Sequence, residues 1–192
     1  MSGLTKSHSV SWQLALDSTF QRIVSHGSET TNQYQDYTVK VIVGGLEPGK
    51  RYFYRFNCQG VSSAIGRTRT LPSGNIDRLG LALASCSNYA FGFFNAYDAI
   101  ARDDAVDFVL HLGDYIYEYA ATGWGAQTAL ALNRVRSPIN EIVSLQDYRE
   151  RHAQYKADPD SRRMHAAKPL LLVWDDHELS LIHISEPTRR NS

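Results

Sequence analysis

The sequence predicts a small all-β domain followed by an α/β domain. The first 72 residues contain short runs of strand-forming residues separated by turn residues, which is typical of a β-sandwich. After a short linker, strand-like runs alternate with helix-like segments, and this alternation predicts parallel strands joined by crossovers. A composition with 43% hydrophobic and 21% charged residues is typical of a soluble globular protein.

The all-β domain is expected over residues 1–72. Its strands are predicted at 9–16, 22–27, 36–43, 52–59 and 63–70. Pro48 and Gly49 form a turn, and Tyr52, three residues after the glycine, suits a tyrosine corner, in which the phenol binds upstream backbone. These features favour an immunoglobulin- or fibronectin-like sandwich. Such a sandwich has about seven strands, so we expect the first one or two strands to be missing here.

The α/β domain is expected over residues 73–178, after a turn-rich linker at 71–75. Buried strands are predicted at 79–85, 107–112 and 168–174, and helices at 92–102 and 145–157. In a parallel sheet the carboxyl ends of the strands lie at one edge, and ligands bind there. The chemistry of this chain is therefore expected at three strand ends.

The composition excludes several classes of protein. Lys+Arg and Asp+Glu both number 20, and this balance argues against a nucleic-acid or anionic-membrane partner. No apolar run approaches the roughly 18 residues that a membrane span needs, and the N-terminus lacks the apolar core of a signal peptide. Two cysteines are too few for a disulfide framework.

Residues 179–192 do not fit the α/β pattern. The run 179–189 closely resembles the translation of a sequencing-library adapter, so we expect 179–192 to be read-through rather than part of the fold. The alternative is a genuine frayed tail. On the first interpretation, the natural sequence stops near Glu178, within the α/β domain.

All three strand ends carry side chains that can bind metal ions. They are Cys86 after the first strand, Asp114 and Tyr117 after the second, and Asp175, Asp176 and His177 after the third. Carboxylates bind hard cations, whereas thiolate and imidazole groups suit transition metals. Their shared position at one edge of the sheet predicts a metal or catalytic site.

Each of these residues also has a structural interpretation, which the sequence leaves open. Cys86 alone could be a small buried apolar residue, Asp114 could cap a turn, and Tyr117 could belong to the core. The adjacent Asp175 and Asp176 are harder to explain in this way. Two like charges at a strand end are costly unless a cation neutralises them.

Seven segments match the motifs of one enzyme family. They are residues 36–41, 46–49, 52–56 and 66–70 in the all-β part, and 85–86, 113–118 and 174–178 in the α/β part. These motifs resemble those of the PhoD-like alkaline phosphatase/phosphodiesterase family within the metallophosphoesterase superfamily. The resemblance covers about residues 11–178 and implies a metallophosphoesterase-type α/β core, truncated in this chain, behind an N-terminal sandwich.

The resemblance implies an enzyme that hydrolyses phosphomonoesters and phosphodiesters at a centre of ferric iron (Fe3+) and calcium (Ca2+). On this basis Cys86 would supply a thiolate and Tyr117 a phenolate to the iron. Asp114 would bridge the iron and a neighbouring metal. Asp176 would bind the second metal.

The resemblance also assigns catalytic roles and a setting. His177 would contact the phosphate or protonate the leaving oxygen, and Asp175 would hold the loop or His177. The partners would be small phosphoester substrates, and a monomer is the default oligomeric state. The full-length parent would be periplasmic or extracellular, although no export signal is present in this chain.

One departure from the family is important. The family carries further His and Asp ligands downstream of its 174–178 motif, whereas His183 here lies in the suspected read-through. We therefore expect an incomplete site, with little or no activity from this chain alone. The alternative function is a non-catalytic protein in which the sandwich binds a partner and the α/β part is vestigial.

Overall fold

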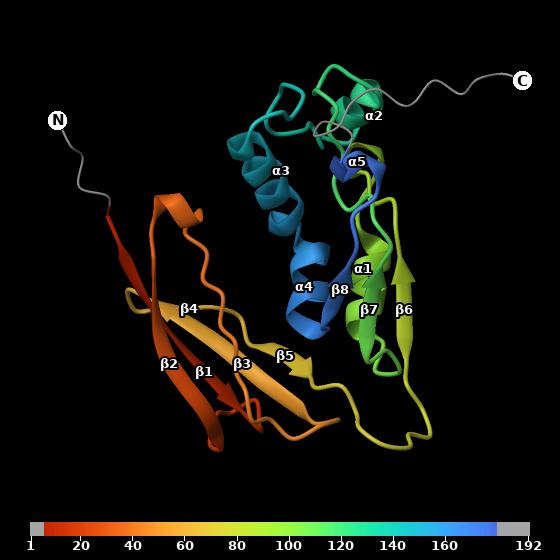
Figure 1. Ribbon diagram of the computed structural model, residues 1–192. Helices are drawn as coiled ribbons and strands as arrows, with labels where there is room; N and C mark the ends of the chain where they lie inside the picture. Colours follow the sequence, from red (N-terminus) through yellow and green to blue (C-terminus); the bar gives the residue numbers. More distant parts are fainter. Residues whose placement is uncertain (1–5, 180–192) are drawn as a thin grey trace, which may run out of the picture. The chain divides into compact units, whose positions relative to one another are not determined.

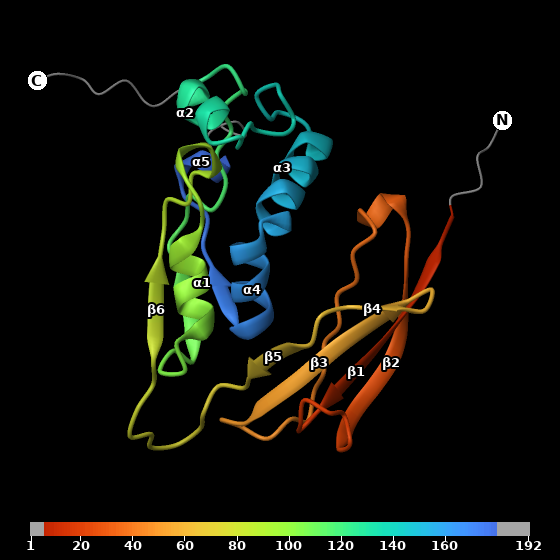
Figure 2. The same ribbon diagram turned by 180° about the vertical axis from the view of Figure 1, so that it is seen from behind.

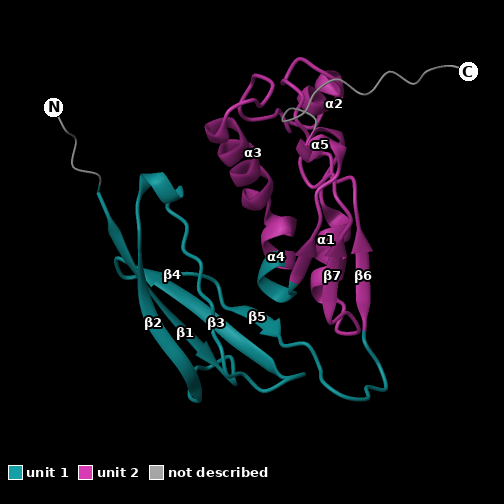
Figure 3. Ribbon diagram, viewed as in Figure 1, with its two compact units in different colours: residues 1–79, 165–169 teal, residues 80–164, 170–192 magenta. Residues whose placement is uncertain are grey.

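The computed structural model describes residues 6–179, which belong to two compact units (Figures 1, 2 and 3). Unit 1 holds residues 1–79 and 165–169, and unit 2 holds residues 80–164 and 170–192. Unit 1 thus extends past the boundary that the sequence predicts at residue 72. Of the suspected read-through at 179–192, only Leu179 lies within the described residues.

Unit 1 contains an antiparallel sheet with the strand order β2-β1-β3-β4, in which β5 also pairs with β3. Its strands are β1 (His8–Ala15), β2 (Ile23–Thr31), β3 (Arg51–Cys58), β4 (Val61–Ser62) and β5 (Gly66–Arg69), and a short 3-10 helix, η1 (Gln33–Gln35), follows β2. These strands confirm the predictions at 9–16, 22–27 and 52–59. The strand predicted at 63–70 is present in a shorter form.

The strand predicted over residues 36–43 is wrong. The chain turns there through left-handed backbone at Asp36, with φ 53°, and no strand is assigned to this segment of the described chain. Val41 and Val43 line a pocket with residues of β1 and β3, whereas Ile42 between them is 98% exposed. The alternating apolar pattern therefore indicates that one side of this segment is half-buried. A strand also needs a neighbouring strand to accept and donate its backbone hydrogen bonds. The described residues of unit 1 form one sheet, whereas a sandwich has two.

Tyr52 forms the predicted tyrosine corner. The residue is 2% exposed, and its phenol oxygen accepts a hydrogen bond of 3.0 Å from the Glu47 backbone N–H. Gly49 turns the chain between the two residues with φ 68°, a value that glycine adopts without strain. The bond fixes the turn that leads into β3.

Unit 2 is built on a parallel sheet with the order β6-β7-β8, which confirms the predicted parallel pairing. Its strands are β6 (Leu81–Ala84), β7 (Phe108–His111) and β8 (Leu170–Leu172). Its helices are η2 (Tyr89–Phe91), α1 (Asn95–Arg102), α2 (Ala126–Ala131), α3 (Leu145–Ala157), α4 (Pro159–Ala167, whose last residues belong to unit 1) and α5 (Asp176–Leu179). Both predicted helices are present, since α1 and α3 occupy their ranges.

The two faces of the unit 2 sheet differ in burial. His111 faces helix α1, where its Nε2 lies 2.8 Å from Tyr97 Oη. Leu83 and Leu171 both pair with Leu110, the neighbour of His111, and so lie on the opposite face. They are 65% and 56% exposed. The prediction that β6 and β8 are buried strands is therefore wrong for these two residues. They lie on the face of the sheet opposite helix α1.

Helix α3 begins at a capping box. The Ser144 hydroxyl accepts the Asp147 backbone N–H at 3.2 Å, and the Asp147 carboxylate accepts the Ser144 N–H at 2.8 Å. These reciprocal bonds satisfy donors that a helix N-terminus would otherwise leave unpaired. The helix then directs Arg151 and Tyr155 into the core of unit 2.

Residues 6–179 include neither a membrane-spanning helix nor a disulfide. None of their helices combines the length and the apolar character that crossing a bilayer requires. Cys58 and Cys86 are both free thiols.

His152 on α3 predicts acid sensitivity of unit 2. Its ring stacks on Tyr115, and burial, with a contribution from Lys156, lowers its pKa to about 4. An unfolded histidine has a pKa near 6.5, so the unfolded chain binds more protons between pH 6.5 and 4. Stability therefore falls as the pH falls through this window, by roughly 2 kcal/mol when the partial exposure of the ring is allowed for.

Urea unfolding of the wild-type chain and of His152→Gln at several pH values measures this effect. The wild-type free energy of unfolding should drop between pH 6.5 and 4, and His152→Gln should flatten this drop. His26→Gln serves as the control and should keep the wild-type profile. A profile that His152→Gln leaves unchanged would contradict the assignment.

Candidate metal centre

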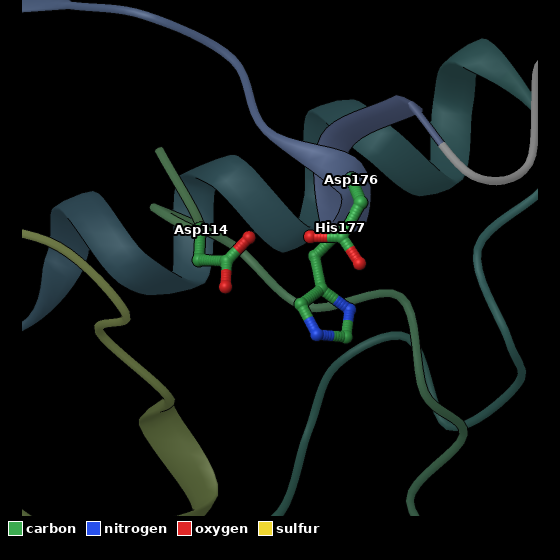
Figure 4. Close-up of side chains that lie close together, drawn as sticks. All are labelled: Asp114, Asp176 and His177. Carbon is green, nitrogen blue, oxygen red and sulfur yellow. The ribbon is translucent and has the colours of Figure 1, made fainter. Parts of the chain in front are cut away.

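Three ligand-type side chains lie together at the carboxyl edge of the unit 2 sheet. Asp114, Asp176 and His177 each offer one donor atom, and these atoms all lie within 4.8 Å of one another (Figure 4). Asp114 follows β7, whereas Asp176 and His177 belong to α5, just after β8. The parallel pairing of β7 with β8 brings the two strand ends together, as the sequence predicts.

The Asp114 carboxylate is also the point at which Cys86 and Tyr117 meet. Its Oδ2 lies 3.6 Å from Cys86 Sγ and 3.3 Å from Tyr117 Oη. Its Oδ1 is buried and finds no hydrogen-bond partner among the described residues. A buried carboxylate oxygen without a partner is costly, and a metal ion would satisfy it. The residues present therefore fit a metal ion that accepts carboxylate, phenolate, thiolate and imidazole donors.

Tyr117 stands as a neutral phenol in this arrangement. Burial, together with the neighbouring Asp114 carboxylate and Cys86, raises its pKa far above the ordinary value. The phenol accordingly donates its hydrogen to Asp114 Oδ2. Binding to a metal ion would release this proton, since phenolate is the ligand form.

Glu118 holds His177 in place. Its Oε2 lies 2.7 Å from His177 Nδ1, and the imidazole ring also packs on Tyr117 with a centroid distance of 4.3 Å. Since a carboxylate only accepts hydrogen bonds, Nδ1 carries the hydrogen, and Nε2 is left for a ligand. Glu118 does not stand out in the sequence. Its only signal was its place in the 113–118 motif.

Asp175 lies beside the group of three rather than within it. Its side chain is exposed, and its backbone N–H donates to Glu178 Oε2 at 2.8 Å. Among the site residues predicted from the sequence, the structure thus brings Cys86, Asp114, Tyr117, Asp176 and His177 together, with Asp175 at the margin.

Arg151 braces the chain after β7 from inside unit 2. The residue is fully buried, and its guanidinium donates to the backbone carbonyls of Tyr117, Tyr119, Ser137 and Pro138. Five donors in a rigid fork allow one arginine to bind several carbonyls at once. Periodicity places Arg151 on a helix but gives no sign that it is buried, so its role cannot be predicted from the sequence.

The loops of the centre have unusual backbone. Cys86, Gly113 and Asp114 all have positive φ, with values of 56°, 105° and 52°. For Cys86 and Asp114 this conformation costs about 1 kcal/mol or more, and such outliers cluster at functional sites. A Cβ atom on Gly113 would lie 2.4 Å from Asp175 Cβ and 2.9 Å from its backbone nitrogen. Glycine at this position therefore lets the loops after β7 and β8 touch.

Comparisons with known proteins agree with this geometry. Residues 81–180 match the family model described as PhoD-like phosphatase, and residues 2–72 match the model of the PhoD-like phosphatase N-terminal domain. Alkaline phosphatase D of Bacillus subtilis (strain 168) is 42% identical over 173 residues, which cover 88% of this chain and 29% of that protein. A solved structure titled "Structure of PhoD" matches with a TM-score of 0.82 and 39% identity, over 93% of this chain and 34% of that one.

Gly113→Ala tests the contact between the two loops. The substitution should lower the free energy of opening of unit 2 by about 2–4 kcal/mol, because it combines left-handed strain with a clash against backbone. Gly60→Ala in unit 1 has a similar φ of 81° but open space around its Cβ, so it should cost only about 1 kcal/mol. Amide hydrogen exchange in β7 and in β3 measures the two losses. Equal losses would show that the contact with Asp175 is not what requires glycine.

Proposed function

Because the chain belongs to the PhoD-like phosphatase family, we propose that it forms the metal-binding part of a phosphoesterase that hydrolyses phosphomonoesters and phosphodiesters. The observation that carries this proposal is the group of Asp114, Asp176 and His177 at the edge of a parallel sheet. The chain spans about a third of the length of the relatives that it matches, with 29% of one and 34% of the other. The activity proposed is therefore that of the whole protein.

The proposed metals are ferric iron and calcium. Cys86 and Tyr117 would bind Fe3+, because thiolate and phenolate are strong anionic donors that favour the ferric state. Asp114 would contact both ions, and Asp176 would bind Ca2+, which prefers carboxylate oxygens. When bound, such ions neutralise charge on phosphoryl oxygens and acidify a coordinated water molecule.

The protein's own side chains would then orient the phosphoester and move its proton. His177 belongs to the donor group, and Glu118 holds its Nδ1, so Nε2 is left to contact the phosphate or to protonate the leaving oxygen. Asp175, beside them, would help to hold the loop. The described donors are too few for complete coordination, because Ca2+ alone takes about 6–8 oxygen ligands. We therefore expect little or no turnover from this chain alone.

We extend the proposal to the setting of the protein. A formal net charge of zero favours small phosphoesters over nucleic acids as substrates. A monomer is the default oligomeric state. Unit 1 would be one half of an immunoglobulin- or fibronectin-like sandwich. The whole protein is proposed to act in the periplasm or outside the cell.

Asp114→Asn tests the proposed function. The wild-type chain, supplied with Fe3+ and Ca2+, should bind both ions and release at most a little nitrophenol from nitrophenyl phosphate and bis(nitrophenyl) phosphate. The variant should bind metal at least about tenfold more weakly, because a neutral amide replaces the shared carboxylate. It should show no hydrolysis. Elemental analysis and a colorimetric rate assay measure the two effects.

The exposed Asp77 in unit 1 provides the matched control for this substitution. Asp77→Asn should behave as the wild type in both measurements. Metal binding and hydrolysis that Asp114→Asn leaves unchanged would contradict the proposal. A non-catalytic protein that binds a partner through unit 1 would then explain the chain better.

The iron assignment has its own spectroscopic test. The chain loaded with Fe3+ should show a visible phenolate-to-iron charge-transfer band, and Tyr117→Phe should abolish it. Tyr119→Phe is the control, because Tyr119 packs on His177 but makes no contact with Asp114 among the hydrogen bonds of the described residues. A colourless, iron-free chain that still hydrolyses phosphoesters would refute the assignment.

A further inference from the structure

Glu178 is a buried carboxylate that binds backbone rather than a cationic side chain. The residue is 5% exposed, and its two oxygens accept three N–H groups. Oε2 accepts from Asp114 at 3.0 Å and from Asp175 at 2.8 Å, and Oε1 accepts from Ile116 at 3.0 Å. Hydrogen bonds to a charged acceptor are roughly twice as strong as neutral ones, so this carboxylate is held firmly.

The three donors lie on two segments that are far apart in the sequence. Asp114 and Ile116 follow β7, whereas Asp175 follows β8. Glu178 therefore ties together the two loops that carry the candidate ligands Asp114, Asp176 and His177. Successive N–H groups that converge on one anion around a left-handed residue form a backbone nest, and here the anion is a side chain of the protein itself.

Asp114 is fixed from both sides by these bonds. Its N–H is bound by Glu178, and its carbonyl accepts the Ser87 N–H at 2.9 Å. The neighbouring Gly113 carbonyl accepts the Cys86 N–H at 3.2 Å. With its backbone held at both ends in a left-handed conformation, the Cα–Cβ bond of Asp114 has a fixed direction.

We propose that Glu178 is a positioning residue that pre-organises the metal centre by holding the backbone of Asp114 and Asp175 in the geometry that metal binding requires. This role rests on the proposed metal-dependent function. It adds a residue that touches neither metal nor substrate but acts through Asp114. Residues that orient ligands in this way typically contribute about 10- to 100-fold to metal affinity.

Glu178→Gln is the informative substitution. Glutamine keeps the size of the side chain and one oxygen, but its NH2 group would face one of the three backbone N–H donors. The variant should remain folded, as judged by circular dichroism, and bind Ca2+ about 10- to 100-fold more weakly in calorimetric titration. The ferric charge-transfer band should weaken in parallel. Glu141→Gln, an exposed carboxylate in the same unit, is the matched control and should retain wild-type affinity.

The wild-type chain offers a measurement that does not depend on a folded variant. The amides of Asp114, Ile116 and Asp175 should exchange with solvent as slowly without metal as the amides of β7. Fast exchange in the metal-free chain would overturn the proposal, because the loops would then be organised only by the ion.

The outcomes separate this proposal from the proposed function. If the wild-type chain binds neither Fe3+ nor Ca2+, the proposed function fails. If the wild type binds them and a folded Glu178→Gln chain binds them equally well, only the role of Glu178 fails. A variant that loses stability but keeps its affinity would show that Glu178 serves folding alone.

Discussion

Asp114 can serve the centre because the strand before it lies in the middle of a parallel sheet. Strand β7 pairs with β6 on one side and with β8 on the other, so the loop after β7 reaches both neighbouring loops. Cys86 approaches from the first, and His177 from the second. A sheet with β7 at its edge would leave Asp114 with one neighbour, and the donors could not surround a single carboxylate.

Much of the fold follows from local sequence patterns. Parallel pairing in unit 2 was predictable, because strands that alternate with helices leave few other arrangements. Tyr52 was also predictable, since a tyrosine corner depends on a short turn and one phenol. The strand predicted at 36–43 is wrong, because an alternating apolar pattern indicates only which residues are buried. Whether a segment forms a strand also depends on a pairing partner elsewhere in the chain. The predicted burial of Leu83 and Leu171 is wrong for a similar reason, because an apolar run does not indicate which face of a strand is covered.

The site was predictable where chemistry and position coincide. Cys86, Asp114 and His177 are recognisable because each follows a strand and each can bind a metal ion. The residues that hold them were not predictable. Glu118 and Glu178 are carboxylates like many others. The imidazole that Glu118 holds lies 59 residues away in the sequence, and the Asp114 N–H that Glu178 binds lies 64 residues away. Only the folded chain shows that Glu118 orients the His177 imidazole and that Glu178 holds backbone N–H groups.

The brace formed by Arg151 has a consequence for how such proteins diverge. Arg151 binds the chain after β7 through carbonyl oxygens, and every amino acid supplies a carbonyl whatever its side chain. Tyr119 can therefore be exchanged during evolution without loss of the bond that its backbone makes. Since the Tyr119 ring lies against His177, the surface beside the centre can diversify while the scaffold stays the same. Arg151 must therefore be kept, whereas the side chains of the loop can change.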